Sequence, residues 1–375
     1  MSDLDQRIHL RLDELSASAQ RRLLRVPDAR LIDVSSNDYL GLSRHPLVIA
    51  RACQWAQQHG AGSRASRLVT GTSQALLDLE RKLAAFKGTE AALIFATGFQ
   101  LNSAVLPALF ELDEKPLIFT DRLNHASLHA GCRGMRQIRY RHNDTAHLDA
   151  LLQANPGRLR FIVTESVFSM DGDRSDVAAL ATLAQRHQAV LYLDEAHATG
   201  VLGSDGRGLA ADVASLPADT ILMGTLGKAL GSAGAYVAGS QALIDWLVNR
   251  CAGFIYSTAP APAALGAVDA ALDLLPGMDA ERARLAALAG QLRAALQARG
   301  FDTLASSTQI VPAVIGDAAA TLNAAQHMAQ AGVLAIAIRP PTVPAGTARL
   351  RFALSTALTD AEFARVLKAV ATLSV

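Results

Sequence analysis

The middle of this sequence repeats one pattern, in which short, continuously apolar runs alternate with amphipathic stretches. Continuously apolar strands are typical of a mostly parallel sheet with helices on both faces, because neither face of such a strand meets water. The pattern therefore predicts an α/β fold with a large, mostly parallel sheet. The expected strands are residues 91–95, 116–119, 161–164, 190–193, 221–223 and 235–237, and two of the helices between them are 73–86 and 177–187.

The texture of the sequence changes after Pro260. Residues 261–275 and 280–298 are rich in alanine and leucine and predict two helices, with Gly300 as the C-cap of the second. The remainder predicts a smaller α+β domain with strands at 309–315, 333–338 and 348–353 and helices at 319–331 and from residue 360. We expect an N-terminal arm at 1–45, a large domain at 46–270 and a small C-terminal domain at 271–375. Within the arm, the spacing of apolar residues predicts a helix around residues 8–15 and a strand at 31–34.

The composition excludes several classes of protein. Half of the residues are hydrophobic, 18% are charged and the net charge is +1, so the chain is neither disordered nor basic enough to indicate nucleic-acid or membrane-surface binding. The three cysteines are too few and too scattered for a disulfide framework or a metal site. The polar N-terminus and the absence of a long apolar run predict a soluble, cytoplasmic protein.

Two polar side chains stand where apolar runs end. Lys228 lies in a glycine-rich octet, residues 224–231, after one run, and Asp194 closes the run at 189–193. Ligands of open α/β sheets bind outside the carboxyl ends of the strands, so both side chains can face one crevice. An amine and a carboxylate are the pair that pyridoxal 5′-phosphate (PLP) needs, one for a Schiff base and one for the pyridine nitrogen. Taken singly, a lysine among glycines is more often a surface turn residue. An aspartate after a strand is more often a turn former or a helix cap.

A possible phosphate site follows the first expected strand. Thr97, Gly98 and Phe99 open a helical stretch, and a glycine at a helix N-terminus exposes backbone N–H groups to an anion. Thr225, three residues before Lys228, can add a hydroxyl. Without the other motifs, Thr97 and Gly98 would be interpreted as an ordinary helix cap.

Together, five segments resemble the α-oxoamine synthases, fold-type-I enzymes that use PLP. The segments are residues 35–42, 121–127, 164–173, 194–197 and 224–231. The resemblance runs from about Ile8 to the C-terminus. It implies a homodimer that joins an amino acid to an acyl thioester with loss of carbon dioxide.

The resemblance also implies roles for individual residues at the cofactor. Lys228 carries PLP and acts as acid and base at the substrate Cα, and Asp194 keeps the pyridine nitrogen protonated. His125 stacks on the cofactor face and contacts substrate. His197 and Ser169 bind the phenolic oxygen.

Further roles concern the phosphate and the substrates. Ser257 and Thr258, supplied by the neighbouring subunit, would join Thr225, Gly98 and Phe99 at the phosphate. The implied substrate-binding residues are Asn37, His125, Thr342, Arg351, which holds the amino-acid carboxylate through a bidentate pair, and Arg22, with the adjacent Arg21 left open as its alternative.

Residues 337–351 resemble the biotin-pathway branch of this family, which uses L-alanine and a pimeloyl thioester of coenzyme A or acyl-carrier protein. The alternatives are a glycine C-acetyltransferase (2-amino-3-ketobutyrate coenzyme A ligase) or another sister synthase, and a non-catalytic regulator on the same fold. A regulator of that kind needs an additional DNA-binding domain, for which this chain has neither room nor basic excess. The chain departs from the family pattern at residues 61–67, where more glycines are expected, and at Ala198 and Leu226.

Overall fold

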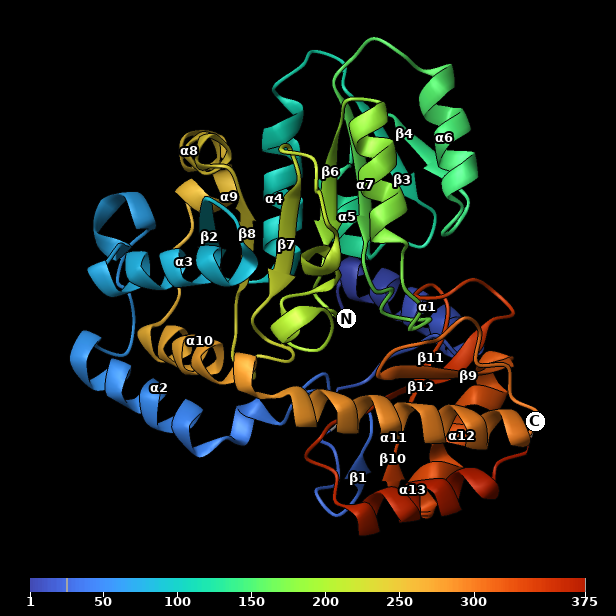
Figure 1. Ribbon diagram of the computed structural model, residues 1–375. Coiled ribbons are helices and arrows are strands. Elements are labelled where there is room, and N and C mark those ends of the chain that lie inside the picture. Colours follow the sequence, from blue (N-terminus) through green and yellow to red (C-terminus); the bar gives the residue numbers. More distant parts are fainter. Residues whose placement is uncertain (25, 375) are drawn as a thin grey trace. The chain divides into compact units, whose positions relative to one another are not determined.

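The computed structural model describes residues 1–24 and 26–374, which form two compact units (Figure 1). The large unit comprises residues 37–169 and 174–283, and the small unit comprises residues 1–36, 170–173 and 284–375. The N-terminal residues join the small unit because β1 (Ile32–Asp33) pairs in parallel with β10 (Val333–Leu334). The domain bounds expected at residues 45 and 270 stay predictions.

A seven-stranded sheet forms the centre of the large unit, in the order β2-β8-β7-β6-β5-β3-β4. Only β8 runs antiparallel to its neighbours, so the predicted mostly parallel sheet is confirmed. The strands are β2 (Ala91–Phe95), β3 (Leu117–Asp121), β4 (Gln137–Tyr140), β5 (Arg160–Glu165), β6 (Ala189–Asp194), β7 (Ile221–Thr225) and β8 (Ala235–Gly239).

Helices cover both faces of this sheet. One core contains side chains of α4 (Gly98–Phe110), α5 (Ala126–Gly131), α8 (Gln241–Arg250) and α9 (Ala252–Ile255), and a second contains those of α6 (Thr145–Ala154) and α7 (Val177–Arg186). Strand β5 serves both: Phe161 and Val163 enter the first core and Ile162 the second. This alternation is what a strand buried on both faces requires.

The other helical elements of the large unit lie before β2 or after β6. They are η1 (Leu42–Arg44), α2 (Pro46–His59), the π-helical turn η2 (Arg67–Gly71), α3 (Gln74–Lys87), η3 (Ser204–Gly206), η4 (Leu209–Asp212), α10 (Pro262–Leu274) and η5 (Leu275–Gly277). Helix α11 (Asp279–Ala298) begins in the large unit and ends in the small one. In the described part of the chain, no helix is both long and apolar enough to cross a membrane.

The small unit contains an antiparallel sheet in the order β11-β12-β9, in addition to the β1–β10 pair. Its elements are α1 (Asp3–Ala17), β9 (Ile310–Gly316), α12 (Ala318–Gln330), β11 (Ile336–Ile338), β12 (Ala348–Ala353) and α13 (Asp360–Ala371). The single strand predicted at 333–338 is wrong, because the chain changes partner after Leu334. The Ser35 hydroxyl donates to Leu334 O (3.1 Å) and accepts from Ile336 N–H (3.0 Å), so it separates β10 from β11.

A buried ion pair supports the carboxyl end of β6. Lys87 Nζ lies 2.7 Å from Glu195 Oε2, with the two side chains 1% and 0% exposed. Burial favours the neutral amine, but the Glu195 carboxylate and Tyr236 outweigh it, so the pKa of Lys87 is raised. The other carboxylate oxygen of Glu195 accepts the Ala210 N–H (3.0 Å). This pair fixes the residue that directly follows Asp194.

Replacing Lys87 with methionine should destabilise the protein by about 3–5 kcal/mol, because Glu195 would stay buried without its cation. The measurement is the urea midpoint of unfolding of Lys87→Met against the unchanged protein. Arg81→Met, on the same helix but in an exposed pair with Asp78, is the matched control and should change the midpoint little. Equal midpoints for Lys87→Met and the unchanged protein would contradict the prediction.

Candidate active site

Polar side chains gather at one edge of the large sheet. Asp121, Glu165, Asp194 and Thr225 are the last residues of β3, β5, β6 and β7. These four strands are parallel, so their carboxyl ends meet at the same edge. The site is therefore built from strand ends, as the sequence predicts.

Asp194 is held in a fixed orientation at the end of β6. It is buried, its Oδ2 accepts from Asn102 Nδ2 on α4 (3.0 Å), and its Oδ1 accepts from Ala196 N–H (2.9 Å). Both side-chain oxygens of Asp194 are therefore held by donors of the large unit. A buried, oriented carboxylate is the group that a protonated pyridine nitrogen needs.

Asn102 connects Asp194 to the segment that carries His125. Its amide also donates to Ser127 Oγ (2.9 Å), its carbonyl accepts from Tyr192 Oη (2.7 Å), and Ser127 Oγ lies 2.7 Å from His125 Nδ1. Partial burial, opposed by the charge of Asp194, lowers the pKa of His125. This imidazole is thus biased toward its neutral form.

Lys228 is the end of a second hydrogen-bonded chain. Its Nζ lies 2.7 Å from His197 Nε2, and His197 Nδ1 lies 2.6 Å from Tyr39 Oη, which donates to Asn37 Oδ1 (3.0 Å). Tyr39 is fully buried, and its hydroxyl holds the Nδ1 side of the His197 ring. The geometry places the lysine amine and the histidine in direct contact.

The backbone after Lys228 needs glycine. Gly231 has φ +67°, and a Cβ there would come within 2.3 Å of Ser43 N. An L-residue would therefore be strained and would also displace the segment after Asn37. The octet around Lys228 is glycine-rich partly for this close packing.

The start of α4 has the features of an anion site. Thr97 caps the helix by accepting from Gln100 N–H (3.1 Å), and the N–H groups of Gly98 and Phe99 belong to the first turn, where helices lack internal acceptors. Gln100 Nε2 donates to Ser257 Oγ (2.6 Å), so Ser257 lies near α4 of its own chain.

The other predicted cofactor residues are Ser169, Thr258 and Thr225. Ser169 is buried in the loop after β5, and Thr258 is exposed and forms an isolated β-bridge with Ser66. Thr225 Oγ1 donates to Gly234 O (3.1 Å) and accepts from Gly227 N–H (3.3 Å). Their roles at the phosphate and the phenolic oxygen stay predictions.

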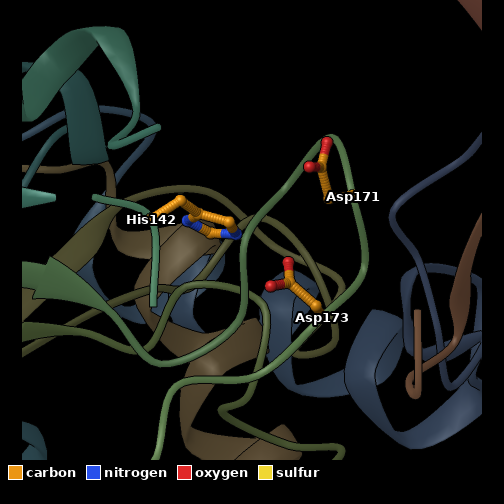
Figure 2. A group of neighbouring side chains, drawn as sticks. All are labelled: His142, Asp171 and Asp173. Carbon is orange, nitrogen blue, oxygen red and sulfur yellow. The ribbon is translucent and has the colours of Figure 1, made fainter. Parts of the chain in front are cut away.

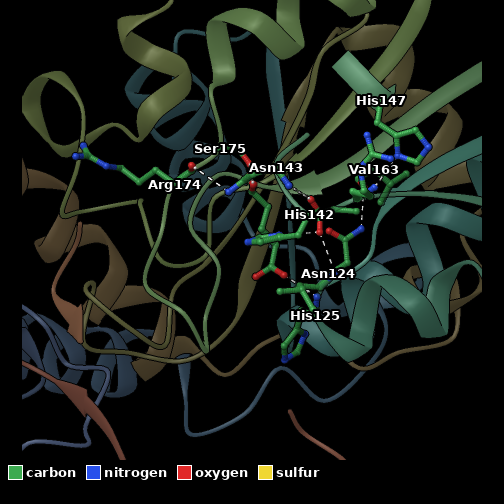
Figure 3. Close-up of polar contacts among 12 residues, drawn as sticks. Asn124, His125, His142, Asn143, His147, Val163, Arg174 and Ser175 are labelled. Atoms are coloured by element: carbon green, nitrogen blue, oxygen red, sulfur yellow. Dashed lines mark hydrogen bonds and ion pairs between the residues drawn. The ribbon is translucent and has the colours of Figure 1, made fainter. Parts of the chain in front are cut away.

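The loop between β3 and α5, which presents His125, is anchored to β5. His125 N–H donates to Glu165 Oε1 (2.6 Å), and Asn124 Nδ2 donates to Val163 O (2.7 Å; Figure 3). Nearby, Asp121 accepts from Asn143 N–H (2.8 Å) and lies 2.9 Å from His142 Nδ1. Buried carboxylates thus fix the loops at this edge.

In the small unit, two of the predicted substrate residues touch each other. Arg22 Nη2 donates to Thr342 Oγ1 (2.8 Å), and both residues line a cavity of about 810 Å³ with Arg21. The other lining residues are mostly apolar and include Leu23, Val26, Leu322, Ile336 and Ile338. Arg21 instead donates to Ser16 Oγ (3.4 Å). The two neighbouring arginines therefore have different hydrogen-bond partners.

Two further arginines lie on β12. Arg349 forms a buried ion pair with Asp171, which Figure 2 shows at the tip of its loop with Asp173 on the same loop. Arg351, the predicted carboxylate-binding residue, is 7% exposed. Its role and that of Asn37 stay predictions, because the two residues belong to different units.

Sequence reasoning missed the residues behind the site. Asn102, Tyr192 and Ser127 orient Asp194 and His125, and Tyr39 supports His197. A signal existed for Asn102, which is a polar residue on a largely apolar helix. No local pattern identifies its partners.

Comparisons with known proteins show the family and fold of this chain. A family model for class I and II aminotransferases matches residues 29–370. The 8-amino-7-oxononanoate synthase of Gluconacetobacter diazotrophicus is 55% identical, over 98% of this chain and 97% of that protein. A solved 8-amino-7-oxononanoate synthase from Francisella tularensis is 26% identical with a TM-score of 0.77, covering 92% of this chain and 98% of that one. A serine palmitoyltransferase from S. paucimobilis with a bound PLP–myriocin aldimine is 25% identical with a TM-score of 0.90, covering 99% and 98%.

Replacing Asn102 with leucine should weaken PLP binding about 5- to 150-fold, because Asp194, Ser127 and Tyr192 lose a shared buried partner at a cost of about 1–3 kcal/mol. The measurement is a fluorescence titration of the cofactor-free protein with PLP. Asn249→Leu is the control, since Asn249 is an exposed residue of α8 that bonds only locally to Asp245 O. An unchanged affinity in Asn102→Leu would show that Asp194 is oriented without Asn102.

Proposed function

Because this chain belongs to the class I and II aminotransferase family, we propose that it is a PLP-dependent 8-amino-7-oxononanoate synthase. Such an enzyme condenses L-alanine with a pimeloyl thioester, releases carbon dioxide and serves biotin biosynthesis. The observation that carries the proposal is the near full-length identity of 55% to a synthase of that name. The five sequence segments resemble the α-oxoamine synthase family, and residues 337–351 resemble its biotin-pathway branch.

The residues of the large unit fit PLP. They supply an amine (Lys228), a buried and oriented carboxylate (Asp194), imidazoles (His125 and His197) and the start of a capped helix at Gly98. This donor set matches the aldehyde, the pyridine nitrogen, the ring and the phosphate of the cofactor. When bound, PLP supplies the electron sink that makes proton loss and decarboxylation possible.

The reaction needs one group that moves a proton at the substrate Cα. Lys228 Nζ takes this proton from L-alanine and returns a proton after carbon dioxide has left. His197 Nε2, 2.7 Å from Nζ, keeps the amine placed between these steps. Asp194, held by Asn102 and by the Ala196 N–H, would hold the pyridine nitrogen.

We assign substrate-binding roles in each unit separately. In the small unit, Arg351 binds the L-alanine carboxylate. In the large unit, Asn37 and His125 are the substrate-binding residues. The cavity at Arg22 and Thr342 has apolar walls that suit the methylene groups of a pimeloyl chain. The acyl donor is the thioester of coenzyme A or of acyl-carrier protein.

We further propose that the enzyme is a cytoplasmic homodimer in which Ser257 and Thr258 reach the phosphate of the neighbouring subunit. Exposed apolar side chains on the large unit support association, since apolar patches often mark interfaces. They include Leu68, Val69, Phe99 and Tyr256.

The function is tested with the PLP-loaded protein. L-Alanine should shift the absorbance of the bound cofactor, and pimeloyl-CoA should then release free thiol together with 8-amino-7-oxononanoate. Glycine with acetyl-CoA is the comparison. Turnover with glycine and acetyl-CoA alone would identify a glycine C-acetyltransferase, and cofactor binding without turnover of either pair would favour the non-catalytic regulator.

The two neighbouring arginines allow a sharper test of the acyl site. Arg22→Ala should raise the KM for pimeloyl-CoA about 10-fold or more, because a charge-assisted contact worth about 1.5–3 kcal/mol is lost. The KM for L-alanine should stay unchanged. Arg21→Ala is the matched control. A larger rise in the KM for pimeloyl-CoA in Arg21→Ala than in Arg22→Ala would assign the acyl-binding role to Arg21.

A further inference from the structure

Glu165 is a buried carboxyl group at the site that the proposed reaction does not use. It is the last residue of β5, and its register partner on β6 is Asp194, the last residue of that strand. Glu165 is 3% exposed and Asp194 is 4% exposed. Two acidic side chains therefore lie side by side, out of water, at the edge that binds the cofactor.

The side chain of Glu165 contacts the backbone of His125. Its Oε1 accepts the His125 N–H at 2.6 Å, a short hydrogen bond between a strand end and the loop after β3. His125 in turn is the N-cap of α5, and its Nδ1 accepts from Ser127 N–H (3.2 Å). The side chain of Glu165 thus sets where the His125 Cα stands.

We propose that Glu165 is a positioning residue, which holds the His125 imidazole over the cofactor site by accepting the His125 backbone N–H. This inference rests on the proposed function, since it concerns the same cofactor. It gives a role to a side chain that needs to touch neither cofactor nor substrate.

The charge state of Glu165 follows from its surroundings. Burial, and then the negative charge of Asp194, raise the pKa of Glu165 well above its ordinary value, and Asp121 adds to this. The His125 N–H and the charge of Lys228 oppose the rise. A protonated Glu165 still accepts the N–H through one oxygen, and it adds no second negative charge beside Asp194.

The variants Glu165→Gln and Glu165→Ala separate the hydrogen bond from the charge. The glutamine carbonyl can accept the His125 N–H but cannot ionise, so Glu165→Gln should turn over L-alanine and pimeloyl-CoA within about 3-fold of the unchanged protein at neutral pH. Glu165→Ala loses the acceptor, and a displacement of His125 by about 1 Å should lower kcat about 100-fold.

The pH profile gives a readout that a purely structural role would not change. As pH rises through the raised pKa, Glu165 ionises and places a second negative charge beside Asp194, so the unchanged protein should lose activity on the alkaline side. Glu165→Gln should lack this loss. Losses due to Lys228 or His125 are common to both proteins, so the difference between the two profiles reports Glu165.

A second readout needs no cofactor. In the cofactor-free protein, hydrogen exchange of residues 121–131 should be faster in Glu165→Ala and unchanged in Glu165→Gln. Glu80→Gln is a matched control: Glu80 is another buried glutamate that accepts a strand N–H, from Ile94 (2.8 Å), but it pairs with Arg67. That variant should lose stability without altering the exchange of residues 121–131 or the alkaline loss of activity.

Unchanged exchange and kcat in Glu165→Ala would overturn the proposal, as would identical alkaline pH profiles for Glu165→Gln and the unchanged protein. Failure of the proposed function is a separate result. If the unchanged protein binds PLP but forms no product, the exchange data, together with the visible circular dichroism of bound PLP, still decide whether Glu165 positions His125.

Discussion

Burial of the central sheet on both faces is the constraint on which the rest of this structure depends. Phe161 and Ile162 point into opposite cores, so both faces of strand β5 pack against apolar side chains. The carboxylates of the site accordingly lie at the strand ends. The parallel strands bring Asp121, Glu165, Asp194 and Thr225 to one edge, and this convergence makes the site.

Confining charges to a buried edge requires that each has a partner. Asp194 is held by Asn102, and Glu195 is paired with Lys87 from α3. Glu165, the third carboxyl of this group, meets the cost of burial by a raised pKa. The edge therefore combines an oriented carboxyl group at Asp194, a carboxyl group with a raised pKa at Glu165 and a closed ion pair at Glu195.

The sequence predicted the fold well where the signal was local. The apolar runs located β2, β3, β5, β6, β7 and β8, and the change in texture after Pro260 located α10 and α11. Strand β4 (Gln137–Tyr140) was missed, because polar residues alternate in it and it lies at the sheet edge. An edge strand with polar residues has no distinctive apolar run.

The candidate site residues could be predicted from the sequence where they belong to local motifs. Motifs in the sequence pointed to Lys228, Asp194, His125 and His197, and the structure places all four in the large unit. Their roles at the cofactor stay predictions. The supporting residues were not predictable, because the contact of Asn102 with Asp194 depends on how α4 packs on the sheet. The contact of Arg22 with Thr342 was also not predictable, because about 320 residues of sequence separate them.

The pairing of β1 with β10 has a consequence for folding during synthesis. Roughly 300 residues separate Ile32 from its partner Val333. At translation rates of about 5–20 residues per second, the N-terminal strand leaves the ribosome about 15–60 s before its partner exists. The strands of the large unit, from residue 91 to residue 239, are complete well before then. The first part of the chain to be made is thus among the last to find its place.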